Sequence, residues 1–137
     1  MADYSEKHAR SGLRDKLPRL DVIANQFKGY RISIVIPEYS SLCPRSGMPD
    51  NGTVTIEYEP AGHFVELKSL KYYILGYRNL GIFYENAVNR ILKDFVRAVK
   101  PRWALVRGEF KPRGGINSTV EAKYGRVPGR ETRLQRH

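Results

Sequence analysis

The chain has 137 residues, enough for one domain with a buried core, and its hydrophobic share of 41% excludes a wholly disordered chain. No apolar run approaches the roughly 20 residues of a membrane-spanning helix, and residues 1–20 lack the apolar segment of a secretory signal. The single cysteine excludes an intramolecular disulfide, so we expect a cytoplasmic protein without a membrane partner. The net charge of +10 suits an anionic partner, either nucleic acid or a phosphorylated cofactor.

The first half of the chain predicts an arm, two strands and a loop. Residues 1–25 are polar and poorly patterned, which indicates a loose N-terminal arm. Residues 31–38 alternate isoleucines with other side chains, as a half-buried strand does, and Pro37 ends this predicted strand. Residues 40–52 are rich in Pro, Gly and Ser and predict a structured loop. Residues 53–58 alternate again and predict a second strand.

The second half predicts two helices and then two strands. Apolar residues recur at helical spacing over residues 69–77 and, in a longer stripe, over residues 82–99. Residues 103–110 and 116–123 predict the third and fourth strands. This order favours an α+β domain, with two helices on one face of an antiparallel four-stranded sheet. A sheet this small leaves two edges that copies of the chain could cover, which favours a homo-oligomer.

The predicted domain spans residues 26–124 and is followed by a basic C-terminal tail, residues 125–137. The tail holds four arginines and one glutamate, and we interpret it as a solvated segment. Such a tail can attract RNA without specificity, so no stable nucleic-acid partner is expected.

Cys43 is the first candidate for chemistry. A lone cysteine is usually a small buried hydrophobe, but this one opens the loop Cys-Pro-Arg-Ser-Gly-Met-Pro-Asp, where Arg45 and backbone N–H groups would favour a thiolate. Asp50 closes the same loop, and a thiolate beside an acid suits addition to an electrophilic carbon with protonation of its heteroatom. The alternative for Asp50 is an Asx turn. No metal site is predicted, because His63 is the only histidine outside the tails.

Other candidates suit the binding of anions and of a base. Lys68 and Lys71 share a face at a helix start with Ser69 and the first-turn N–H groups, which suits phosphates, although a solvated face is the alternative. Glu85 can accept two parallel N–H bonds from a guanine-like edge, or it can simply complement the helix dipole. Arg113 can hold a cofactor phosphate, or it can flank a plain turn.

These motifs together resemble the 7-cyano-7-deazaguanine reductases, in the short single-module branch of that family. The loop of residues 43–50 is similar to the family segment CPxTGxPD. Residues 66–73 match the family signature E-(S/L)-K-(S/A)-hydrophobic-K-(L/Y)-aromatic at all eight positions. The likeness covers residues 33–125, most of the chain. Three further matches follow in family order: Arg78 with Asn79, Glu85, and the turn at residues 112–115.

The resemblance implies a tunnelling fold, in which copies of a two-helix, four-strand unit close into a barrel, with active sites between subunits and two pentameric rings stacked face to face. It implies that NADPH reduces the nitrile of 7-cyano-7-deazaguanine, through a thioimide on Cys43 and with protons relayed by Asp50, in a step toward queuosine in tRNA. Burial is expected to raise the pKa of Asp50 so that it holds a proton. The implied substrate site comprises the backbone of Val65, Glu66 and Leu67 with Tyr84 and Glu85, and the implied cofactor site Lys68, Ser69, Lys71 and Arg113.

Two residues depart from the family pattern. Tyr84 stands where many members carry a histidine, and Met48 replaces a common glutamine. Three other functions compete with the reductase. An amidinotransferase acting on the same nitrile in tRNA should lack the signature of residues 66–73. An RNA-binding module would leave the loop of Cys43 unexplained, and a zinc-dependent pterin enzyme of the same fold is disfavoured by the single cysteine.

Overall fold

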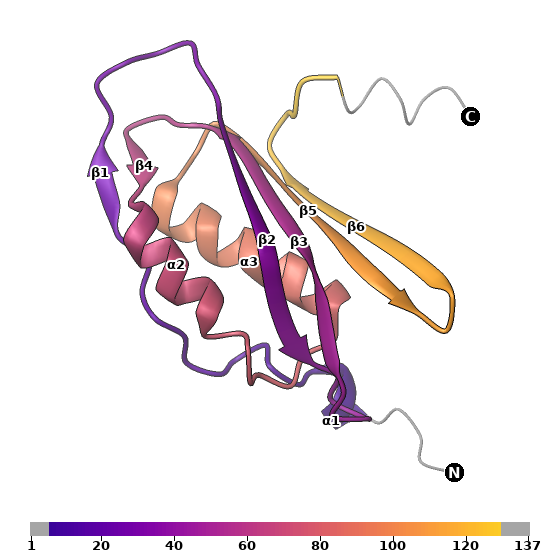
Figure 1. Ribbon diagram of the computed structural model, residues 1–137. Helices are drawn as coiled ribbons and strands as arrows, with labels where there is room; N and C mark the ends of the chain where they lie inside the picture. Colours follow the sequence, from indigo (N-terminus) through magenta and orange to yellow (C-terminus); the bar gives the residue numbers. More distant parts are fainter. Residues whose placement is uncertain (1–5, 130–137) are drawn as a thin grey trace.

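The computed structural model describes residues 6–129. Its centre is a four-stranded antiparallel sheet in the order β2-β3-β5-β6, with a separate two-stranded sheet formed by β1 and β4. Helices α2 and α3 lie on one face of the larger sheet, as the sequence predicted (Figure 1). The elements in chain order are α1 (Glu6–Ala9), β1 (Val22–Ala24), β2 (Ile32–Leu42), β3 (Pro49–Glu59), β4 (His63–Val65), α2 (Leu67–Leu75), α3 (Tyr84–Val99), β5 (Trp103–Arg113) and β6 (Ile116–Tyr124).

Strands β2 and β3 are longer than the sequence predicted. Pro37 does not end β2, because the register shifts between Ile36 and Tyr39 and the strand continues past this irregularity. A proline without a backbone N–H is tolerated there, since β2 is an edge strand of the sheet. Most of the predicted loop of residues 40–52 is therefore strand, and the true loop is residues 43–48.

The core lies between the helices and the sheet. The apolar stripe of α3 is buried as its spacing predicted, and Phe95 meets the ring of Tyr58 edge-on, with ring centroids 4.7 Å apart. Burial of such large side chains is the main favourable term in folding. The helix ends at Lys100, a left-handed residue directly before Pro101. No helix within residues 6–129 is long and apolar enough to cross a membrane.

The described part of the N-terminal arm, residues 6–25, is held against the domain, which corrects the prediction that this part is loose. Strand β1 pairs with β4, and Leu20 is buried in the main core. The Arg90 guanidinium of α3 donates hydrogen bonds to the backbone carbonyls of Gly12 and Asp15. Because these bonds use backbone atoms of the arm and not an apolar stripe, the side-chain pattern of the arm gave no sign of them.

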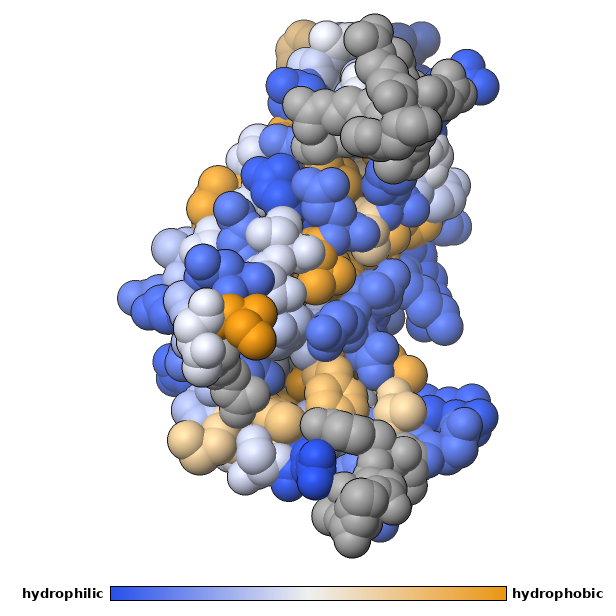
Figure 2. All heavy atoms as spheres, turned by 90° about the vertical axis from the view of Figure 1, so that its right-hand side faces the viewer, coloured by the Kyte–Doolittle hydropathy of each residue, from blue (hydrophilic) through white to orange (hydrophobic). Residues whose placement is uncertain are grey.

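The sheet face opposite the helices carries a small second core, in which Val127 covers Trp103 and Leu105. The side of the molecule that bears β6 is mostly hydrophilic, with hydrophobic residues in separate spots (Figure 2). Residues 130–137, most of the predicted basic tail, lie outside the described part of the chain.

Candidate functional site

Cys43 lies directly after the last residue of β2, at the mouth of the β2–β3 hairpin. Its backbone N–H donates to the carbonyl of Met48 (2.8 Å), and its carbonyl accepts from the N–H of Gly47 (2.9 Å). Gly47 has a φ of 74°, in the left-handed region that favours glycine. The thiol side chain is buried, with 9% of the residue exposed. The N–H groups of Cys43 and Gly47 are therefore used in hydrogen bonds that close the loop. These bonds hold Cys43 in a defined position.

Asp50 is brought to the same end and the same face of the sheet. It is the cross-strand partner of Ser41, which stands two residues before Cys43. Alternation along the strands places Ser41 and Asp50 on the core-facing side. Asp50 is buried, with 5% exposed, and Cys43, directly after β2, is buried too. The hairpin thus brings the two predicted catalytic residues to the same end of the sheet, although they are seven positions apart in the sequence.

An aromatic wall stands beside this pair and includes Tyr84. The Tyr84 ring stacks on Phe110 at a centroid distance of 4.1 Å, and Phe110 meets Tyr39 edge-on at 5.9 Å. The start of α3 is held here by a bridge between Leu42 and Gly81. Glu85 follows Tyr84 in the first turn of α3 and is exposed. The structure therefore places both residues at the Cys43 end of the sheet.

The other predicted residues lie at the start of α2, where Glu66 caps the helix. Its carboxylate accepts hydrogen bonds from the backbone N–H groups of Lys68 (2.9 Å) and Ser69 (2.8 Å), and these bonds hold the pKa of Glu66 below its ordinary value. The Ser69 hydroxyl donates to the Glu66 carbonyl and accepts from the N–H of Asp21. The N–H groups expected to be free for a phosphate are thus already used within the chain.

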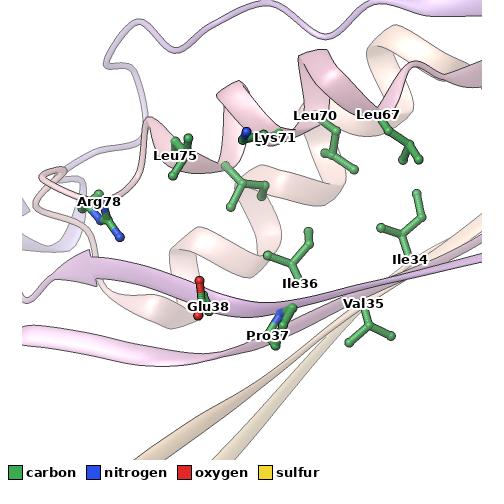
Figure 3. A pocket seen from close by; sticks show the side chains of 11 residues that line it. Ile34, Val35, Ile36, Pro37, Glu38, Leu67, Leu70, Lys71, Leu75 and Arg78 are labelled. Atoms are coloured by element: carbon green, nitrogen blue, oxygen red, sulfur yellow. The ribbon is translucent and has the colours of Figure 1, made fainter.

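The lysine side chains remain available at this place. Lys68 and Lys71 are both exposed, and Lys71 borders a groove of about 330 Å³ between β2 and α2. Ile34 and Ile36 point from β2 toward Leu67 and Leu70 in this groove (Figure 3). Arg78 closes its far end and also borders a polar hollow of about 280 Å³.

Within one chain the two groups of predicted residues lie at opposite ends of the sheet. The N–H of Val65 donates to the Tyr58 hydroxyl (3.0 Å), which fixes the start of α2 beside the far end of β3. Tyr58 is eight residues beyond Asp50 on that strand, which corresponds to about 26 Å. One copy therefore does not bring Lys68 to Cys43.

Arg113 lies toward the Cys43 end of the sheet, beyond Phe110, the last residue of β5 that pairs with β3. It ends β5 and pairs with Ile116 across the turn of Gly114 and Gly115, both of which have positive φ. Within residues 6–129, no three His, Cys, Asp or Glu residues are grouped so that they could hold a metal ion.

Two buried residues close to the candidate site, Tyr39 and Ser41, are not predicted from the sequence. Both are buried on the core-facing side of β2, and the Tyr39 hydroxyl donates to Ser41 Oγ (2.8 Å). The alternation of Tyr39, Ser41 and Cys43 was a usable signal. It was hidden because Pro37 was interpreted as the end of the strand.

Comparison with known proteins identifies the family. A sequence model described as QueF-like protein matches residues 49–128. The chain is 52% identical over 122 residues to the NADPH-dependent 7-cyano-7-deazaguanine reductase of Elusimicrobium minutum, covering 88% of this chain and 92% of that protein. It is 53% identical over 107 residues to the reductase of the same name from Chloroherpeton thalassium, covering 77% and 92%.

A solved structure supports the same assignment. The apo crystal structure of the archaeosine synthase QueF-Like superposes with a TM-score of 0.68 at 25% identity, covering 74% of this chain and all of that one. The chain therefore belongs to the QueF-like family and, within it, to the NADPH-dependent 7-cyano-7-deazaguanine reductases.

Proposed function

We propose that this chain reduces the nitrile of 7-cyano-7-deazaguanine to 7-aminomethyl-7-deazaguanine with two molecules of NADPH, in the cytoplasm, as a step toward queuosine in tRNA. One observation carries the proposal. Cys43 and Asp50 are both buried at the turn end of the β2–β3 hairpin, in a chain that is 52% identical to a reductase of this name.

The first step is covalent. The Cys43 thiolate adds to the nitrile carbon, and Asp50 delivers a proton to the nitrogen, which gives a thioimide bound to the protein. Reduction of the thioimide carbon then releases the Cys43 sulfur and leaves an imine, and reduction of the imine carbon with protonation of the nitrogen gives the amine. Asp50 relays the protons, and NADPH, when bound, would supply one hydride for each of the two reductions of this same carbon.

The residues at the start of α2 fit a phosphorylated cofactor through their charges. Lys68 and Lys71 are exposed on one side of the helix, and Arg78 lies at the other end of the same groove as Lys71. The helix N-terminus contributes less, because Glu66 already accepts from the N–H groups of Lys68 and Ser69. We therefore assign the phosphates to the lysines, and Arg113 remains a further candidate. The pyrimidine edge of the base is assigned to Glu85 and to the backbone of residues 65–67, with Tyr84 at its wall.

We also propose that copies of the chain close into a barrel, as two stacked pentamers, with active sites between subunits. Two observations support this proposal. Strands β2 and β6 are both edge strands of the larger sheet. The start of α2, which carries Lys68, lies beside Tyr58, about 26 Å along β3 from Asp50, so we infer that a neighbouring copy supplies the lysines.

An amidinotransferase is the competing function, because the superposed structure is an archaeosine synthase. The identity of 25% to that chain, against 52% to a reductase, favours reduction. The products differ in mass, so one reaction with both NADPH and ammonia present decides between them.

The decisive experiment is to incubate the protein with 7-cyano-7-deazaguanine alone and to measure its intact mass. We expect a covalent adduct on the wild type that disappears when NADPH is added, with oxidation of NADPH. Cys43→Ala should form no adduct and oxidise no NADPH. An adduct of unchanged mass on Cys43→Ala would refute the covalent role of Cys43.

A further inference from the structure

Ser41 is a buried hydroxyl beside the proposed catalytic pair. Its residue is 0% exposed, and it is one of four buried polar or charged residues among those the structure describes. It is the direct cross-strand partner of Asp50. It also precedes Cys43 by two positions, and Cys43 follows directly after the end of β2. The Ser41 hydroxyl therefore lies beside Asp50 and close along the chain to Cys43.

Tyr39 fixes the orientation of that hydroxyl. The phenol donates to Ser41 Oγ at 2.8 Å, so the serine proton must point elsewhere. The Tyr39 ring itself is 1% exposed and is held by Tyr77 on one side (centroids 5.8 Å apart) and by Phe110 on the other (5.9 Å). Burial raises the pKa of the Tyr39 phenol, with the charge of Asp50 adding to the effect, so the phenol stays protonated and remains a donor.

We propose that Tyr39 and Ser41 are positioning residues for the Cys43–Asp50 pair, an inference that rests on the proposed function. The Tyr39 phenol donates a hydrogen bond to Ser41 Oγ. Ser41 then donates its own proton in a hydrogen bond to the Cys43–Asp50 pair. A hydrogen bond donated to a charged group favours the charged form. The serine thus stabilises the single negative charge that Cys43 and Asp50 carry between them, with one proton left for Asp50 to deliver, while neither Tyr39 nor Ser41 reacts with the substrate.

Several other titratable groups stand at this end of the molecule. Tyr77 comes from the segment after α2, Tyr84 and Glu85 belong to the first turn of α3, and Arg45 lies in the loop itself. The N-terminal arm reaches this end at Ser11, whose hydroxyl donates to the Gly81 carbonyl (2.6 Å) and carries no charge. These groups are unchanged in the variants below, so a shift between variants reports on the hydroxyls removed.

The test measures the pH dependence of Cys43 alkylation by iodoacetamide, followed by intact mass. Cys43 is the only cysteine, so every added mass reports on this thiol. Ser41→Ala should shift the profile upward by about one pH unit, which is about a tenfold loss of thiolate at a fixed pH. Tyr39→Phe should shift it in the same direction by less. Ser41→Thr keeps the hydroxyl and should restore the wild-type profile.

Tyr73→Phe is the matched control. Tyr73 is another buried tyrosine of the same core, but its phenol bonds to Asp94 and Tyr77, away from Ser41. It should lose thermal stability without a shift of the alkylation profile. If Ser41→Ala and Tyr39→Phe both keep the wild-type profile, or if Tyr73→Phe shifts it equally, the inference is wrong.

Alkylation needs neither substrate nor cofactor, so its outcome is independent of the reaction assigned above. Adduct formation with 7-cyano-7-deazaguanine is measured on the same variants. A wild type that forms no adduct but shows the predicted alkylation shifts would refute the proposed function and leave the role of Tyr39 and Ser41 standing. If every variant forms the adduct normally and the alkylation profiles do not shift, the role of Tyr39 and Ser41 is refuted and the proposed function is kept.

Discussion

Glu66 shows how the surroundings of one side chain decide what it does. Its place in the signature of residues 66–73 pointed to the substrate site. In the structure its carboxylate caps α2, and the two backbone N–H groups that it binds lower its pKa. Its carboxylate therefore serves the fold.

This cap predicts a pH-dependent contribution to stability. Because the pKa of Glu66 is lowered in the folded chain, its contribution is fully present above the ordinary value of 4.5 and is lost as the pH falls through the lowered value. Glu66→Ala should therefore lower the Tm at pH 7 and flatten its dependence on pH below 4.5. Glu38→Ala, at an exposed position of β2, is the control, and thermal melts at several pH values check both.

Asp50 carries the second prediction at this scale. Asp50→Asn keeps the shape of the side chain and removes its proton, so the rate of NADPH oxidation should fall by about 10²–10⁴-fold. The melting temperature should change little by comparison. Turnover within a factor of two or so of the wild type would exclude Asp50 as the proton donor.

At the scale of elements, the β2–β3 hairpin and strand β5 together build the aromatic wall. Gly52 stands opposite Phe110 in the β3–β5 pairing. A Cβ atom at Gly52 would lie 2.4 Å from the Glu109 carbonyl oxygen and 2.9 Å from the Phe110 ring. Gly52 is thus required because the Glu109 backbone and the Phe110 ring approach it closely. Tyr84 stacks on that ring.

Gly52→Ala should consequently destabilise the fold by about 1–3 kcal/mol, because the backbone of β5 must shift to admit a methyl group. The displaced Phe110 and Tyr84 should also slow adduct formation on Cys43. Gly62→Ala is the matched control, since a Cβ atom there meets nothing within 4 Å. Equal melting temperatures for the two variants would contradict the packing described here.

At the scale of the whole molecule, Cys43 and Lys68 lie toward opposite ends of the larger sheet. Both ends of the sheet are fixed by bonds within the chain: Leu42 to the segment at Gly81 at one end, and Val65 to Tyr58 at the other. A single copy has no bend that would join them. The assembly of copies that we propose would form one site from both.

Complementation between variants tests this assembly. Cys43→Ala and Lys68→Glu should each be inactive alone. When the two are co-expressed, about a quarter of the sites between subunits should hold both native residues. The rate of NADPH oxidation should then return to about a quarter of the wild-type rate. Mixing the two purified proteins without exchange of subunits is the control. No recovery after co-expression would mean that both residues serve a site from the same chain.

The sequence by itself determined the class of the fold and the chemistry. Alternation and helical spacing are local properties, so the four strands, the two long helices and the buried face of α3 could be predicted. The motif around Cys43 and Asp50 is local too, and family membership confirms the reaction that it indicated.

Only the tertiary structure decided what depends on contacts between distant residues. The arm is held by backbone carbonyls that Arg90 reaches from α3, and the short β1–β4 pair joins two segments with weak patterns. Strand β2 passes Pro37 because pairing with β3 resumes beyond the irregularity. The Tyr39–Ser41 bond and the distance from Cys43 to Lys68 follow from that register. Such features arise where hydrogen bonds and packing across the sheet override local preference, and side-chain spacing does not record them.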